Sequence, residues 1–206
     1  RNPLASISGS IQLLRSTLDL EEDDRRLMEI VNRETDNLNA WITDFLMYAR
    51  PRVGERVSIP IAPLIADSLA VLANDERSAG IEVVFDPASE ASTYGDPTYL
   101  KQVVWNVINN AVQAMNGEGT LTIEISERRE DKGVFNRVAF HDTGPGIPDD
   151  VLERLFEPFF TTKASGTGLG LATVYRIVSE HGGAVSVDTG SSGTTFLVDL
   201  PVHQAA

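Results

Sequence analysis

The sequence contains no cysteine, which excludes a disulfide framework and a thiolate metal site and fits a reducing compartment. No apolar run approaches the ~18 residues that a membrane-spanning helix needs, so we expect no membrane contact and a cytoplasmic location. Basic residues are scarce, with 17 Lys and Arg against 30 Asp and Glu, and the net charge of −13 argues against nucleic-acid binding. An anionic ligand would therefore be held locally, by backbone amides, one or two basic side chains and a divalent cation.

The first quarter of the chain has the pattern of two amphipathic helices. Apolar residues recur every three or four positions at Leu4, Ile7, Ile11, Leu14 and Leu18. This spacing predicts a packed helix over residues 1–18, followed by an acidic turn over 19–24. A second apolar stripe, from Leu27 to Tyr48, predicts another helix that ends near Pro51. Because these stripes exceed what one hairpin can bury, we expect residues 1–50 to form a homodimeric four-helix bundle.

Residues 51–60, with Gly54 and two prolines, are interpreted as a linker, and residues 61–206 as a second domain. Asp96 is expected to cap a helix. Helices are predicted over 63–79 and 97–115, and strands over 81–85, 121–126, 138–142, 184–189 and 194–200, with the last two forming a hairpin around residues 190–193. The elements intermix without regular βαβ alternation, which predicts an α+β sandwich rather than a doubly wound sheet.

Two asparagines stand out in the predicted helix over 97–115. Asn106 and Asn110 are one turn apart, so both amides project from one face. Asparagine is worse than alanine inside a helix by roughly 0.5 kcal/mol, so this pair needs an explanation. Amide oxygens are hard neutral ligands that suit magnesium, whereas a hydrogen-bonded pair of core amides is the alternative. Asn109 projects about 100° away around the helix and is expected to be exposed.

Residues 142–171 carry two glycine clusters on either side of an aromatic, lysine-bearing segment, a layout typical of a nucleotide pocket with a lid. Asp142 ends a predicted strand. A carboxylate only accepts hydrogen bonds and the adenine amine only donates them, so Asp142 could select adenine, with a simple turn aspartate as the alternative. GTGLGL at 166–171 opens a predicted helix, where backbone amides suit a phosphate. It lacks the Gly-Lys-Ser/Thr of a Walker A loop and the GxGxxG spacing of a dinucleotide fold.

The segment FEPFFTTK, residues 156–163, lies between the glycine clusters. Phe156, Phe159 and Phe160 could anchor a lid, and Lys163 could reach a phosphate. A phenylalanine cluster in the core is the alternative interpretation.

Together these segments resemble the transmitter region of bacterial sensor histidine kinases. Residues 106–111 resemble that family's N box, DTGPG at 142–146 its first glycine box, FEPFF at 156–160 its F box, and GTGLGL at 166–171 its second glycine box. HGG at 181–183 and GTTF at 193–196 also fit the family's pattern. The resemblance implies a HisKA-type dimerisation hairpin followed by a Bergerat-type ATP-binding α/β sandwich.

The resemblance implies ATP and Mg²⁺ as cofactors. Asn110, assisted by Asn106, would bind magnesium, and Asp142 would bind the adenine amine. The other residues expected to surround the nucleotide are Gly144, Gly146, Ile147, Phe156, Thr162, Lys163, Gly166, Thr167, Gly168, Leu169, Gly170 and Leu171. Many family members carry Lys or Arg three residues after the second N-box asparagine, where this chain has Gln113. Our hypothesis is that Lys163 supplies the missing charge.

RNPLA, at residues 1–5, resembles the end of the family's H box, His-Glu-x-Arg-Asn-Pro-Leu. That pattern places the phosphoacceptor histidine three residues before Arg1, and none of His141, His181 and His203 fits its place. His181 is instead interpreted as a helix-terminating residue. With the nucleophile and its glutamate base both ahead of Arg1, we expect no autophosphorylation by this chain alone. Asn2 is expected where this class orients water to dephosphorylate its partner's aspartate.

The predicted function is therefore an ATP-dependent protein-histidine kinase core that phosphorylates the preceding histidine and then an aspartate of a response-regulator receiver domain, with regulator phosphatase activity as a further expectation. RNPLASISGSIQLL and FEPFFTTK resemble nitrogen- and pilus-regulation sensors, whose regulators act at σ54-dependent promoters. The resemblance implies a cytoplasmic protein or the cytoplasmic part of a membrane-anchored sensor. Two alternatives stay open: a gyrase- or mismatch-repair-like ATPase module, and a non-catalytic dimeric module that binds nucleotide and a regulator.

Overall fold

The computed structural model describes residues 6, 7, 9, 10, 13, 14, 21–49, 55–130, 133–163 and 166–202. The chain divides into two compact units, Arg1–Arg50 and Pro51–Ala206. None of the helices in these described ranges is both long enough and apolar enough to cross a membrane.

The first unit contains one long helix, α2 (Glu22–Ala49), which confirms the second predicted helix. It begins earlier than expected, because three acidic residues of the predicted turn form its first turn, where they interact favourably with the helix dipole. The predicted apolar stripe remains accessible in the single chain, with Leu27, Val31, Leu38, Trp41 and Phe45 all exposed. Six residues of the predicted helix over 1–18 are described and all are helical; its other residues, Asn2 among them, lie outside the described part.

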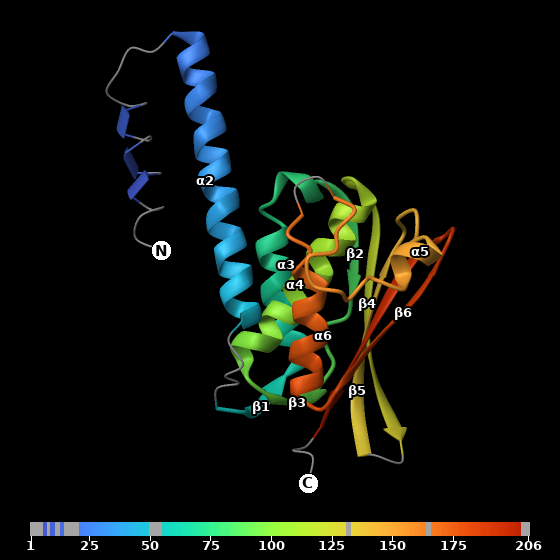
Figure 1. Ribbon diagram of the computed structural model, residues 1–206. Coiled ribbons are helices and arrows are strands. Elements are labelled where there is room, and N and C mark those ends of the chain that lie inside the picture. The colour runs from blue at the N-terminus through green and yellow to red at the C-terminus, as the bar shows by residue number, and fades with distance from the viewer. Residues whose placement is uncertain are drawn as a thin grey trace. The chain divides into compact units, whose positions relative to one another are not determined.

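The second unit is built on a five-stranded sheet with the strand order β2-β4-β5-β7-β6 (Figure 1). Its strands are β2 (Gly80–Phe85), β4 (Glu118–Glu130), β5 (Gly133–Asp142), β6 (Ala184–Gly190) and β7 (Gly193–Pro201). β2 pairs with β4 in parallel and the other neighbours are antiparallel, which confirms the β6–β7 hairpin and the pairing of the two middle strands. β4 is longer than the predicted strand over 121–126. Its outer half is exposed and polar, so no apolar pattern marked it, and pairing with β5 holds it in the sheet.

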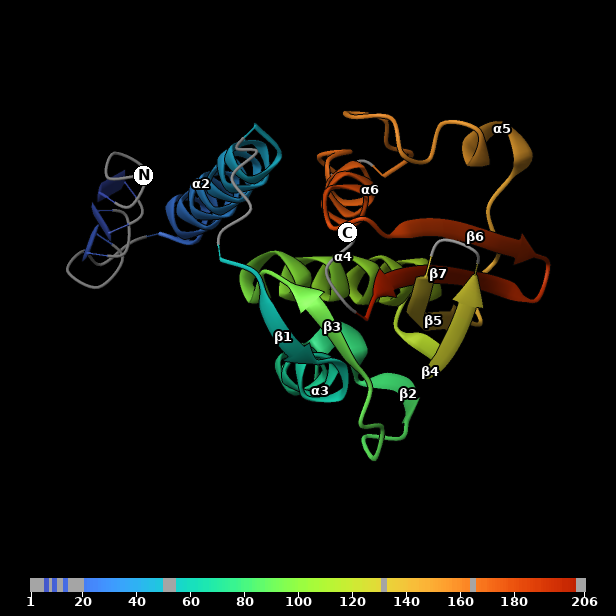
Figure 2. The same ribbon diagram turned by 90° about the horizontal axis from the view of Figure 1, so that it is seen from below.

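One helix layer covers one face of this sheet (Figure 2). It consists of α3 (Ile61–Leu72), α4 (Pro97–Met115) and α6 (Gly170–Glu180), with a short 3-10 turn, η1 (Glu76–Ser78), after α3 and a one-turn helix, α5 (Asp149–Leu152), outside the layer. The predicted cap of α4 is confirmed, since Asp96 Oδ1 accepts hydrogen bonds from the Thr98 and Tyr99 amides.

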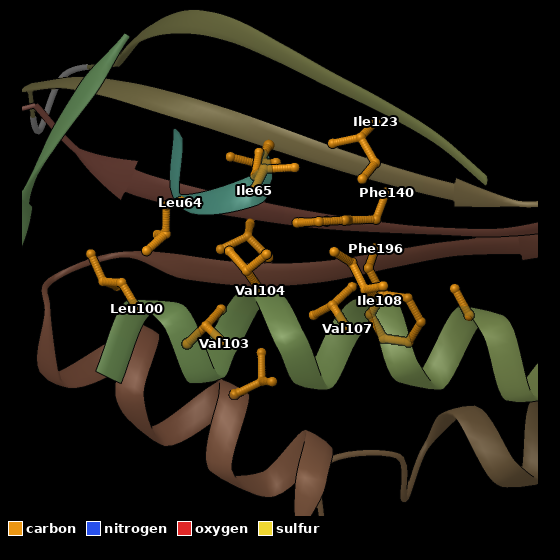
Figure 3. Packing of buried hydrophobic residues seen from close by; sticks show 14 of the residues in the cluster. Leu64, Ile65, Leu100, Val103, Val104, Val107, Ile108, Ile123, Phe140 and Phe196 are labelled. Atoms are coloured by element: carbon orange, nitrogen blue, oxygen red, sulfur yellow. The ribbon is translucent and has the colours of Figure 1, made fainter. Parts of the chain in front are cut away.

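The core lies between α4 and the sheet (Figure 3). Phe140 of β5 and Phe196 of β7 are fully buried and lie against the side of α4 that carries Val104 and Ile108. Burial of such side chains contributes roughly 1.5–3 kcal/mol each to folding. Because α3, α6 and the sheet all contact α4, the helix is held in place, and so are the polar side chains that it carries.

The predicted linker over 51–60 is wrong in its second half. Val57–Pro60 form strand β1, which pairs antiparallel with β3 (Ser92–Gly95) in a separate two-stranded sheet. Pro60 ends this short strand and precedes α3, a position that needs no backbone donor. The predicted helix over 63–79 has wrong bounds as well, because α3 begins at Ile61 and ends at Leu72. Beyond the helix, the Ser78 hydroxyl donates to the carbonyl of Leu72.

Candidate functional site

The asparagine pair of α4 faces two other motif segments. Asn106 Nδ2 donates to the carbonyl oxygen of Gly170, 3.1 Å away, at the first residue of α6. Asn110 Oδ1 accepts a 2.8 Å hydrogen bond from the ammonium of Lys163. Asn109 is half-buried rather than exposed, so that expectation is wrong, because α3, α6 and the sheet surround much of α4.

Lys163 has a second partner on α4. Its Nζ lies 2.7 Å from Gln113 Oε1, at the position where the resemblance led us to expect a basic residue. Although the residue as a whole is exposed, desolvation around the ammonium lowers the pKa of Lys163, and the carboxylate of Asp142 partly opposes that shift. The basic charge of this site thus comes from residues 156–163 and reaches two amide oxygens of α4.

Asp142 ends β5 and is 1% exposed. Desolvation raises the pKa of its carboxyl, and hydrogen bonds from the backbone amides of Gly144 and Thr194 oppose that shift. The Gly144 amide donates to Asp142 Oδ1 over 2.9 Å. A Cβ on Gly144 would lie 2.7 Å from Asp142 Oδ1 and 3.4 Å from Ala114 Cβ, so a side chain there would displace the buried carboxylate. Ala114 is one turn after Asn110, which brings the first glycine box to the asparagine face.

The rest of the first glycine box is attached to the β6–β7 hairpin. Gly146 has a φ of +80°, and a Cβ there would overlap the carbonyl oxygen of Gly190. The Ile147 amide donates to Thr189 Oγ1 over 2.9 Å, and the Ile147 side chain packs against the core. These contacts fix the turn after Asp142, and nothing in the sequence pointed to Thr189.

The phenylalanines of the F box are not buried, so the alternative of a core cluster is wrong. The Phe156 ring lies 5.4 Å from that of Tyr175, and the Arg154 guanidinium lies 4.1 Å from the Phe160 ring centroid. Phe159 is 62% exposed and has a φ of +67°, which is unusual for a bulky residue. Its amide donates to the Gly168 carbonyl over 3.0 Å, so the F box is joined to the second glycine box.

The second glycine box leads into α6, with Gly170 as the first helical residue. Two of its amides already have partners: Gly166 donates to the Lys163 carbonyl and Leu169 to Thr167 Oγ1. The Leu169 side chain is buried and that of Leu171 packs against the core, so only the backbone of these two residues could face a phosphate. Thr162 is exposed.

The donor set suits magnesium shared with a phosphate. Among the residues that the structure describes, no three His, Cys, Asp or Glu side chains gather as a metal site. Asn110 Oδ1, however, already accepts a cationic group, the Lys163 ammonium. Magnesium keeps several waters and binds through few protein oxygens plus substrate phosphates, so one or two amide ligands fit its chemistry.

The chain matches two family models: the histidine kinase-, DNA gyrase B-, and HSP90-like ATPase over residues 95–204, and the His Kinase A (phospho-acceptor) domain over residues 1–54. It is 35% identical over 205 residues to the sensor histidine kinase ZraS of Salmonella typhi, covering 98% of this chain and 43% of that protein. It is 33% identical over 220 residues to the sensory histidine kinase/phosphatase NtrB of Rhizobium leguminosarum bv. phaseoli, covering 100% of this chain and 56% of that protein. The chain thus spans about half the length of these relatives.

Solved structures share the fold. Full-length ShkA in complex with AMPPNP superposes with a TM-score of 0.79 at 29% identity, covering 100% of this chain and 44% of that one. The nucleotide-free catalytic domain of histidine kinase ThkA gives 0.62 at 31% identity, covering 72% of this chain and 96% of that domain. ThkA in complex with the response regulator protein TrrA gives 0.71 at 28% identity, covering 99% of this chain and 59% of that one. The predicted α/β sandwich of Bergerat type is confirmed, and the chain belongs to the two-component sensor histidine kinases, of which it comprises the transmitter region.

Proposed function

We propose that this chain is the catalytic core of a protein-histidine kinase. It binds ATP with Mg²⁺, and the γ-phosphate passes to the histidine that the H-box pattern places three residues before Arg1, and then to an aspartate of a response-regulator receiver domain. The observation that carries this proposal is the hydrogen-bonded junction of α4 with two motif segments: Asn110 with Lys163, and Asn106 with Gly170. These contacts join the N box to FEPFFTTK (residues 156–163) and to the second glycine box.

Asp142 is proposed to recognise adenine. Its carboxylate is buried at the end of a strand and is oriented by the Gly144 amide, so little reorganisation is needed when a donor approaches. Ionised, it accepts hydrogen bonds only, which matches the adenine amine and opposes the guanine carbonyl. Gly144 and Gly146 shape the turn beside it.

Phosphate binding is proposed for the opposite part of the site. Lys163 supplies the positive charge that Gln113 does not, and the backbone at Gly166, Gly168 and Gly170 surrounds the phosphates, with Thr162, Thr167, Leu169 and Leu171 beside it. Asn110, assisted by Asn106, would hold magnesium, which when bound neutralises charge on the phosphates. During transfer a new N–P bond forms on the acceptor imidazole, the bond from the γ-phosphorus to the bridging oxygen breaks, and ADP leaves.

The partners are proposed from the apolar stripe of α2 and from the relatives. The exposed stripe fits a homodimer through residues 1–50, ahead of a catalytic domain that extends to residue 206. The NtrB relative is named a kinase/phosphatase and ThkA has been solved with a response regulator, which supports a receiver-domain partner and regulator phosphatase activity. We further propose that Asn2 takes part in that phosphatase activity, from its place in the RNPLA segment, and that the regulator is a σ54-dependent activator, from the resemblance of FEPFFTTK to nitrogen- and pilus-regulation sensors. We also propose a cytoplasmic location, because the sequence has no cysteine, which fits a reducing compartment.

A transfer assay tests the kinase proposal. This chain is mixed with γ-³²P-ATP, magnesium and an acceptor version of itself that carries an H box ahead of Arg1 together with Asp142→Asn. We expect label on the acceptor and none on the chain itself. Asp142→Asn in the donor should weaken ATP binding tenfold or more, because a buried charge-assisted hydrogen bond is worth about 1.5–3 kcal/mol. Asp67→Asn, which removes an exposed carboxylate paired with Lys101, is the matched control.

The outcomes separate the candidate functions. ATP binding without any labelled acceptor would favour the non-catalytic module, and ATP hydrolysis coupled to dimerisation of the second unit would favour the gyrase-like module. A chain that binds no ATP at all would contradict the kinase proposal and both alternatives.

A further inference from the structure

The ammonium of Lys163 lies between two amide oxygens on the same helix. Asn110 Oδ1 is 2.8 Å away and Gln113 Oε1 is 2.7 Å away, and these residues are three positions apart on α4. Neighbouring neutral amide oxygens on one helix face are a good seat for a cation, because each accepts hydrogen bonds and neither carries an opposing charge.

Local hydrogen bonds also hold the backbone of Lys163. The Lys163 amide donates to Thr161 Oγ1 over 3.1 Å, and the Lys163 carbonyl accepts from the Gly166 amide over 3.2 Å. These bonds fix the lysine backbone relative to Thr161 and Gly166. A Cβ on Gly166 would lie 2.5 Å from Thr161 Oγ1, so a side chain at 166 would displace the hydroxyl that accepts from the Lys163 amide.

Gln113 changes what position 113 can do. The basic residue expected there from the resemblance could only donate hydrogen bonds and would repel Lys163. A glutamine presents an acceptor oxygen and attracts it. The cation of the site therefore comes from Lys163, 50 residues along the chain, and α4 supplies its acceptor, Gln113.

We propose that Gln113 is a positioning residue that, with Asn110, holds the Lys163 ammonium against Asn110 Oδ1. Magnesium would bind that same oxygen, so lysine and magnesium exclude each other at Asn110. This inference rests on the proposed function. Two cations on one oxygen repel, so binding of magnesium with nucleotide releases Lys163 from Asn110, and the lysine, still beside Gln113, turns to the phosphates. Lys163 is thus a placeholder that keeps the asparagine oxygen satisfied while the site holds no nucleotide.

A magnesium titration tests this competition without phosphoryl transfer. The affinity for ADP is measured by displacement of a fluorescent nucleotide, first in EDTA and then over a range of magnesium concentrations. Gln113→Leu removes one of the two oxygens at similar volume, so Lys163 competes less well and the magnesium concentration at half-effect should fall three- to tenfold. Lys163→Met should lower that midpoint at least as much, and should weaken ADP binding in EDTA by about tenfold, because the cation itself is lost.

Two further variants complete the design. Lys101→Met removes a lysine from the same helix, where it pairs with Asp67, and should leave both measurements within twofold of the parent chain. The exchange variant, Gln113→Lys with Lys163→Gln, returns the cation to α4 and should recover the ADP affinity in EDTA that Lys163→Met loses. Thermal melting identifies any variant whose fold is damaged.

A parent-like magnesium midpoint in Gln113→Leu, with intact ADP binding and melting temperature, would overturn the positioning role and leave the proposed function standing. Absence of ADP binding by the parent chain would contradict the proposed function itself, and this inference with it.

Discussion

His181 joins α4 to α6 in the second unit, and its removal should destabilise that unit measurably. The residue follows α6 and is 2% exposed. Its Nε2 lies 3.0 Å from the Asp96 amide nitrogen, which can only donate, and its Nδ1 lies 2.7 Å from the Ile177 carbonyl oxygen, which can only accept. The neutral imidazole with its proton on Nδ1 satisfies both groups, and it holds the start of α4 to the end of α6.

His181→Phe keeps a ring but removes both hydrogen bonds. The Asp96 amide is then buried without its acceptor, which costs about 1–3 kcal/mol. For a domain of this size each kcal/mol lowers the melting temperature by roughly 2–4 °C. His181→Gln keeps an oxygen that can accept from Asp96, and should recover part of the loss.

Urea unfolding followed by circular dichroism, with thermal melting in parallel, measures this effect. His141→Phe is the matched control, because His141 is only half-buried and its Nδ1 lies 2.9 Å from the hydroxyl of Thr195. We expect it to cost well under half as much. If His181→Phe unfolds within about 0.5 kcal/mol of the parent chain at an unchanged slope, the reasoning about the Asp96 amide is wrong.

Three further predictions concern pH, an ion pair and a glycine. Burial chiefly lowers the pKa of His181 below its usual 6.5, so its contribution to stability is full above pH 6.5 and is lost as pH falls through the folded-state pKa; urea titrations at pH 7.5 and 5.5 should show this loss, and His181→Gln should reduce it. Arg137 makes a bidentate, half-buried pair with Asp199 at 2.6 and 2.7 Å, so Arg137→Gln should cost about 1–2 kcal/mol in urea unfolding and leave ADP affinity unchanged. Gly168 has a φ of +65° and a Cβ there would overlap the Phe159 backbone, so Gly168→Ala should weaken ADP binding tenfold or more in fluorescence titrations. A large fall in melting temperature alongside the weaker binding would point to a folding role instead.

Local features of the chain were predictable where one segment contains all the interacting groups. The cap of α4 at Asp96 and the shared face of Asn106 and Asn110 follow from spacing along one helix, and both are present. The apolar stripe of α2 was readable for the same reason. Predictions were wrong where the partner lies elsewhere: Val57–Pro60 looks like a linker by composition, and only pairing with β3 makes it a strand.

The site shows the same division. Its motifs, their order and the family they belong to are contained in the sequence, because glycine, asparagine and aspartate types at given spacings limit the chemistry. The contacts that join them are not: Lys163 with Gln113, Asn106 with Gly170 and Asp96 with His181 connect residues 50, 64 and 85 positions apart. The left-handed Phe159 and the glycine at 168 that fits against it also depend on that packing. The sequence determined by itself which groups this protein carries, through helix periodicity, turn chemistry and motif spacing, whereas the tertiary structure alone decided which of them meet, because hydrogen bonds across such separations form only when burial of the common core brings α4, α6 and the sheet together.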